Sequence, residues 1–195
     1  MQPYRQFDIR PGFLFGIASA LLVLPVKWFL AFMIAALFHE GFHLLALRIL
    51  GGQIQQIRIG AGGAIIKASP LPPGRSLICT LAGPLGSLLL FPLARWFPRL
   101  VLCAVIQSAY NLLPIGDLDG SHALKLCAEL LFSPHTAEIL CRIAGLVLLL
   151  AIIILGLWCT FILNLGILPL LFAGSLVIKG TIGKIPCKSG ALRVQ

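Results

Sequence analysis

The most distinctive property of this 195-residue sequence is how little charge it carries. Only 11% of the residues are Asp, Glu, Lys or Arg, whereas 59% are apolar, and the mean hydropathy is +1.02. A typical soluble domain has about 25% charged and about 50% apolar residues. The shortage of charge therefore disfavours a disordered chain, a collagen, a coiled coil and a soluble enzyme. Of the classes considered, an integral membrane protein is the one that fits this composition.

Acidic residues are the scarcest charged group, with six against 15 Lys and Arg and a net charge of +9. No basic stripe with interleaved aromatic residues accompanies this excess, so no nucleic-acid partner is expected. In a membrane protein, basic residues mark the cytoplasmic loops. The six cysteines include no C-x-x-C pair and no framework spacing, which excludes a disulfide scaffold.

Long apolar runs predict an all-α polytopic membrane protein with about six transmembrane helices in a single domain over residues 1–195. The core motifs lie within residues 28–130, and the last two spans lie at about 139–183. The turn between these two is expected at Asn164–Pro169 or near Trp158–Thr160. The first four runs are Gly12–Val26, Trp28–Leu50, Ser76–Ala94 with a break at Gly83–Pro84, and Leu100–Pro114.

Gln53–Ala68 interrupts the apolar runs with a different pattern. Its isoleucines flank Ala61–Gly63, which predicts two short strands around a glycine turn. Such backbone cannot face lipid, but it can line a cavity or pack on protein. We therefore expect a strand-like re-entrant loop after the second span. After the fourth span, Asp119–Phe132 is expected to form a short amphipathic surface helix.

The distribution of basic residues supports the six-span arrangement. Six crossings place both termini on one side of the membrane, together with 12 of the 15 basic residues. Only Lys27, Arg95 and Arg99 fall on the other side. By the positive-inside rule, both termini are expected to be cytoplasmic.

The second span contains His39, Glu40 and His43 in the pattern H-E-x-x-H. Two histidines four residues apart share one helix face, so both rings can bind one metal ion. Ionisable groups in an apolar helix cost at least about 2.5 kcal/mol each, which a bound dication would offset. The pattern is typical of zinc metallopeptidases, in which the glutamate is the general base. A third ligand is also needed, and spacing alone leaves Asp117 and Asp119 as alternatives.

Three motifs in order, HEGFH, LAGPLGS and NLLPIGDLDG, give the sequence a resemblance to the site-2 protease family of intramembrane zinc metalloproteases. The resemblance covers about residues 10 to 130 and is strongest to the compact bacterial branch typified by stage IV sporulation protein FB. It implies one zinc ion per chain held by His39, His43 and Asp119, with Asp117 as the alternative ligand. It also implies that Asn111 holds the substrate or the oxyanion, and that the strand-like loop pairs with unwound substrate.

The resemblance further implies regulated intramembrane proteolysis by a multi-pass protein of the bacterial cell membrane, with a role in sporulation as one setting. Expected partners are the bilayer, regulatory membrane proteins, and a substrate such as a pro-sigma factor, an anti-sigma factor or a signal-peptide remnant. The rival hypothesis is a metal-binding membrane protein without protease activity, either a permease or a pseudoenzyme. Transporter-like repeat halves are absent from the sequence and Glu40 is present, which favours the protease.

Overall fold

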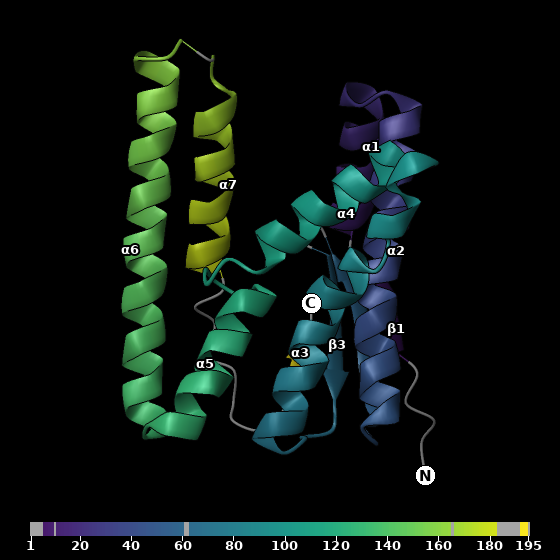
Figure 1. Cartoon of the computed structure of the whole chain (residues 1–195), viewed down its shortest axis with the longest axis vertical. Helices are drawn as coiled ribbons and strands as arrows, with labels where there is room; N and C mark the ends of the chain where they lie inside the picture. The colour runs from purple at the N-terminus through teal and green to yellow at the C-terminus, as the bar shows by residue number, and fades with distance from the viewer. Residues whose placement is uncertain (1–5, 10, 61–62, 165, 183–191, 195) are drawn as a thin grey trace. The chain divides into compact units, whose positions relative to one another are not determined.

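The computed structural model describes residues 6–9, 11–60, 63–164, 166–182 and 192–194, and it is mostly helical (Figure 1). The chain divides into two compact units, residues 1–111 with 188–195, and residues 112–187. The first unit contains β1 (Gln6–Ile9), α1 (Pro11–Val23), α2 (Val26–Ile49), β2 (Ile54–Gly60), β3 (Gly63–Ala68), α3 (Pro73–Leu88), the 3₁₀ helix η1 (Phe91–Arg95), α4 (Pro98–Asn111) and β4 (Leu192–Val194). The second unit contains α5 (Asp119–Leu131), α6 (Pro134–Phe161) and α7 (Leu168–Ile182).

Helix α2 is the central element of the first unit, where it packs against α3 and α4. Its buried residues recur every fourth position and form one stripe: Ala31, Ala35, His39, His43 and Leu47. The helix ends at Ile49, just before the pair Gly51–Gly52, and such a glycine pair is a typical helix stop signal. Gly51 adopts a φ of +80°, and the N–H of Gly52 donates to the Leu47 carbonyl at 2.8 Å. This backbone turn satisfies carbonyls that the last helical turn leaves without partners.

The predicted two-stranded hairpin is confirmed, but it is the middle of a larger sheet. Strands β2 and β3 pair antiparallel, β1 pairs parallel with β2, and β4 pairs antiparallel with β3. The sheet therefore has the order β1-β2-β3-β4. Ile66 and Ala68 of β3 join Leu47 and Cys79 in a buried cluster that holds the hairpin against α2 and α3.

The interruption expected at Gly83–Pro84 is wrong, because α3 runs without a break from Pro73 to Leu88. A proline inside a helix removes one N–H donor and normally kinks or ends the helix. Here Pro84 is buried, and its own carbonyl accepts a hydrogen bond from the Ser108 hydroxyl of α4 at 3.2 Å. This hydrogen bond and the burial hold the middle of α3 against α4, and the helix continues through Pro84. The regular helix ends instead after Leu88, before η1.

In the second unit, α5 begins at the predicted residue, and α6 and α7 form an antiparallel pair (Figure 1). The turn between α6 and α7 falls in the Asn164–Pro169 segment, the first of the two predicted places. Asn164 and Gly166 have φ values of +50° and +78°. These are left-handed conformations that asparagine and glycine adopt more easily than other residues.

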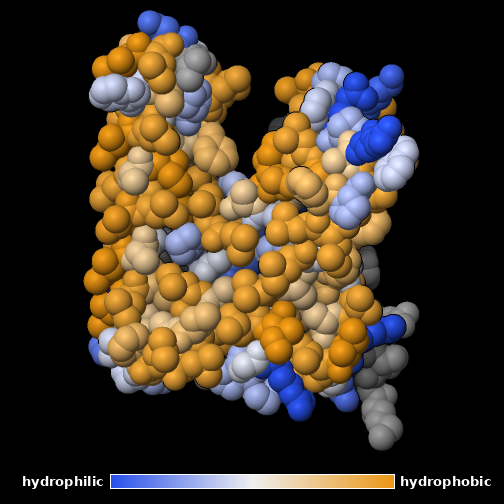
Figure 2. Space-filling view, in the orientation of Figure 1, coloured by the Kyte–Doolittle hydropathy of each residue, from blue (hydrophilic) through white to orange (hydrophobic). Residues whose placement is uncertain are grey.

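Three helical segments are long and apolar enough to cross a membrane: α2, the α3–η1 segment Pro73–Arg95, and α6. The outer faces of these segments carry many exposed leucine, isoleucine and phenylalanine side chains, and Figure 2 shows hydrophobic residues over most of the visible surface. Helices α1, α4 and α7 have only 13, 14 and 15 residues. They rise about 20 to 22 Å, short of a hydrocarbon core of about 30 Å. Six spans therefore stay a prediction, as does the single domain.

Candidate metal centre

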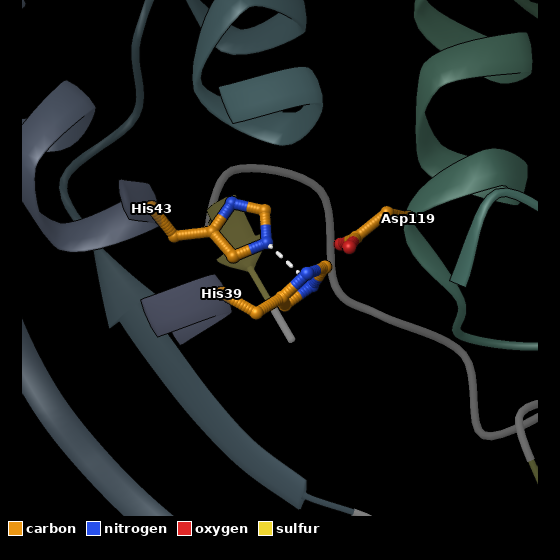
Figure 3. A group of neighbouring side chains, drawn as sticks. All are labelled: His39, His43 and Asp119. Carbon is orange, nitrogen blue, oxygen red and sulfur yellow. Dashed lines mark hydrogen bonds between the residues drawn. The ribbon is translucent and has the colours of Figure 1, made fainter. Parts of the chain in front are cut away.

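His39 and His43 lie one helical turn apart on the buried face of α2, and both side chains are fully buried. Their rings meet edge to face with centroids 4.9 Å apart. The two Nε2 atoms lie 3.3 Å apart and point toward one another, as the dashed line in Figure 3 marks. The predicted convergence of the two histidines is therefore present in the first unit.

The proton on His43 is fixed by its surroundings. Its Nδ1 lies 2.8 Å from the main-chain carbonyl oxygen of Cys79 in α3. A carbonyl oxygen only accepts hydrogen bonds, so Nδ1 must carry the hydrogen and donate it. In the neutral ring, Nε2 then carries no hydrogen and can only accept or bind a cation. The Cys79 thiol donates in turn to the His43 carbonyl at 3.6 Å, which ties α2 and α3 together at this point.

His39 is held in the same tautomer by two side chains. The Nδ2 amide of Asn111, the last residue of α4, donates to His39 Nε2 at 2.9 Å. Nε2 is therefore an acceptor, and Nδ1 carries the hydrogen. Nδ1 lies 3.2 Å from the Ser87 hydroxyl, which itself donates to the Gly83 carbonyl at 3.0 Å.

The two Nε2 atoms fit a tetrahedral zinc ion. With the hydrogen of each ring on Nδ1, the two Nε2 atoms face each other at 3.3 Å, an arrangement that a cation between them would stabilise. Imidazole nitrogens bound to tetrahedral zinc at about 2.0–2.1 Å are themselves about 3.3 Å apart. Because the Asn111 amide uses the same lone pair of His39, an ion on Nε2 would take the place of this hydrogen bond. Geometry and donor chemistry therefore agree with the zinc prediction.

The other predicted site residues lie in two places. Glu40 directly follows His39 on α2 and is partly buried. Asp119 belongs to the second unit, where it is the first residue of α5 and is fully buried (Figure 3). Asp117 precedes α5 and is only partly buried. The first unit thus brings His39, His43 and Asn111 together, whereas the two aspartates start the second.

Ser87 and the Cys79 carbonyl also contact the two histidines, and neither contact was expected from the sequence. Ser87 stands in the LAGPLGS motif one turn after Gly83, and a polar residue in an apolar helix was the signal that could have found it. The Cys79 contribution is a main-chain atom, which no residue pattern reveals. The described cysteines (79, 103, 127, 141 and 159) are all free thiols, as expected, and Cys187 lies outside the described residues.

No family model matches the sequence, and neither does any curated protein. Among solved structures, the chain is similar to a site-2 protease from Methanocaldococcus jannaschii, with a TM-score of 0.67 and 16% sequence identity. The similarity covers 96% of this chain and 94% of that chain. The chain therefore has the fold of a site-2 protease, which agrees with the resemblance seen in its motifs.

Proposed function

We propose that this chain is an intramembrane zinc metalloprotease of the site-2 protease type, which cleaves a peptide bond in or near a transmembrane segment. The observation that carries the proposal is the facing pair of Nε2 atoms, 3.3 Å apart, on a helix long and apolar enough to span a membrane. The site-2 protease fold supports it. Two acceptor nitrogens that face each other at this distance match the ligand geometry of a tetrahedral zinc ion.

Asp119 is proposed as the third ligand and Asp117 as the alternative. His39, His43 and Asp119 are all buried and are all of types that bind zinc. A buried carboxylate is costly unless it is paired or bound to a metal, and Asp119 is fully buried whereas Asp117 is not. One zinc ion per chain would polarise the scissile carbonyl and acidify water.

The remaining chemistry falls to the chain's own residues. Glu40, next to His39 on α2, would take the proton from the attacking water and return it to the leaving amine. The Asn111 amide, which donates to His39 Nε2, would be free to donate to the developing oxyanion once that lone pair is occupied. The four-stranded sheet that contains β2 and β3, with β1 and β4 as its outer strands, would orient an extended stretch of substrate.

The biological setting is proposed from the same resemblance. The protein would be a multi-pass component of a bacterial cell membrane with both termini cytoplasmic, and it would cleave a pro-sigma factor, an anti-sigma factor or a signal-peptide remnant. Regulatory membrane proteins would control access of the substrate. These proposals share one requirement, which is that the purified chain binds zinc and hydrolyses a membrane-spanning peptide.

The test compares wild-type protein in detergent with Glu40→Gln, His39→Ala and two control variants. Metal content is measured by mass spectrometry, and cleavage is measured on single-span peptides that contain helix-breaking residues. Wild type should bind one zinc and cleave. Glu40→Gln should keep the zinc but lose at least about 100-fold in rate, as expected for loss of a general base. His39→Ala should lose the zinc.

The two control variants change residues whose side chains are exposed. Glu138→Gln and His135→Ala make the same chemical changes at exposed positions of α6 and should behave as wild type. If wild type and Glu40→Gln both bind zinc and neither cleaves any peptide, the chain is instead a metal-binding protein without protease activity. If wild type holds no more metal than His39→Ala, the metal centre itself is refuted.

A further inference from the structure

Ser87 is a buried polar group that the proposed reaction does not use. Its side chain is 1% exposed, and it lies on α3 facing α2. Its hydroxyl hydrogen is donated to the Gly83 carbonyl at 3.0 Å, one helical turn earlier. Only the oxygen lone pairs remain for the His39 ring, whose Nδ1 is 3.2 Å away. The hydroxyl is therefore oriented as an acceptor toward His39.

An acceptor at this position selects one tautomer of His39. The ring must present Nδ1–H to Ser87, which leaves the Nε2 lone pair pointing to the other side of the ring, toward His43. The Asn111 amide requires the same tautomer independently, because it donates to Nε2. The contacts with Ser87 and Asn111 thus both place the hydrogen of His39 on Nδ1.

The two histidines obtain this arrangement by different means. His43 donates to the main-chain carbonyl of Cys79, which no substitution removes. His39 donates to a side chain, which a single substitution does remove. The hydrogen-bond acceptor of His43 therefore cannot be removed by mutation, whereas the acceptor of His39, the Ser87 hydroxyl, can be.

We propose that Ser87 is a positioning residue that holds His39 with Nε2 toward the metal. The proposal rests on the metal centre proposed above. Hydrogen-bond partners of metal-binding histidines fix the ring and the tautomer, and their removal typically lowers metal affinity by about 10- to 100-fold. Ser87→Ala should therefore lower zinc affinity by about 10-fold or more, whereas Ser87→Thr, which keeps the hydroxyl, should restore most of it.

Ser108→Ala is the matched control. Ser108 is also a buried serine of the first unit, but its hydroxyl donates to the Pro84 carbonyl and contacts neither histidine in the described hydrogen bonds. Both alanine variants remove one buried hydroxyl and one hydrogen bond to α3. A merely structural role of Ser87 would therefore predict equal effects in the two variants, on thermal stability and on zinc affinity alike.

The experiment has two readouts on the whole protein in detergent. Zinc affinity is measured by competition with a chelator. The tautomer of His39 is measured by nitrogen-15 chemical shifts of labelled histidine before metal is added. Ser87→Ala should weaken zinc binding and increase the Nε2–H form of His39, whereas Ser108→Ala should change neither. Equal zinc affinities and unchanged shifts in the two alanine variants would overturn the proposal.

The two readouts also separate this proposal from the proposed function. If wild type binds no zinc, the metal centre fails, and the chemical shifts alone decide whether Ser87 sets the tautomer of His39. If wild type binds zinc but cleaves no peptide, only the protease activity fails. A loss of zinc affinity in Ser87→Ala that Ser87→Thr does not reverse would count against the hydroxyl as the cause.

Discussion

At the scale of single residues, glycines decide how closely the helices approach the histidines. A Cβ atom added at Gly83 of α3 would overlap the His43 ring. The LAGPLGS motif therefore contains this glycine because the imidazole occupies the space that any other side chain would need. The sequence suggested only a helix break at this point, since glycine beside proline usually marks one.

We predict that Gly83→Ala weakens zinc binding and destabilises the fold. The added methyl group must displace the His43 ring, and overpacking of this kind typically costs about 1–3 kcal/mol. The change is measured as a lower melting temperature and as reduced zinc retention on dialysis. Gly74→Ala is the control, because it lies on the same helix and a Cβ there meets no atom within 4 Å. Equal behaviour of the two variants would contradict the packing argument.

A second residue-scale prediction concerns the third ligand. Asp119→Asn should abolish stoichiometric zinc binding, because an amide is a poor ligand compared with a carboxylate. Asp117→Asn should leave the zinc content at one per chain. Metal analysis of both purified variants is the measurement, and their melting temperatures report whether each remains folded. The opposite pattern would assign the ligand to Asp117.

At the scale of elements, α2 and α3 fit together through one large and one small residue. The large residue is Phe42 of α2, and the small one is Gly86 of α3. A Cβ atom at Gly86 of α3 would overlap the Phe42 ring, so the ring fills space that the glycine leaves open. The Phe42 ring is therefore accommodated by the missing side chain of Gly86 on the opposite helix.

This pairing predicts a measurable coupling between the two positions. Gly86→Ala should destabilise the protein by about 1–3 kcal/mol, because the methyl group and the Phe42 ring compete for one space. In the Phe42→Leu background, the same change should cost clearly less, since the smaller side chain leaves room. Thermal or denaturant unfolding of the four proteins in the cycle gives the coupling free energy. Additive effects would show that the residues do not share this space.

Elements with a strong local pattern could be predicted from the sequence, and those without one could not. The glycine pair after α2, the hairpin of β2 and β3, and the start of α5 each have a distinct signal and are present. Strands β1 and β4 have four and three residues, too few for an alternating pattern. They form because β2 and β3 each have an outer edge that can pair with one more strand. This pairing depends on the folded structure and not on the local sequence of β1 or β4.

At the scale of the whole molecule, the candidate site could be predicted in part. Spacing placed His39 and His43 on one face, because four residues make about one helical turn. It could not choose between Asp117 and Asp119, which follow His43 by more than 70 positions and begin a separate unit. The hydrogen bonds of Ser87 and Cys79 depend on how α3 packs against α2, which the sequence alone does not specify.

The four-stranded sheet sets a condition on the number of membrane crossings. Because β1 and β4 belong to one sheet, residues 9 and 192 would lie on the same side of a membrane that the long apolar helices cross. A chain that leaves a side and returns to it crosses an even number of times. The three long apolar helices alone would leave the two strands on opposite sides. If all three cross, we expect at least one of the short helices to cross as well.

The parity of the crossings can be measured directly. Reporter proteins that are active on only one side of a membrane are fused in turn to the first and the last residue. Both fusions should report the same side, and opposite sides would mean that β1 and β4 cannot pair in the membrane-embedded protein. Four and six crossings satisfy the parity, and three and five do not. The pairing of β4, a strand of three residues, thus predicts an even number of membrane crossings.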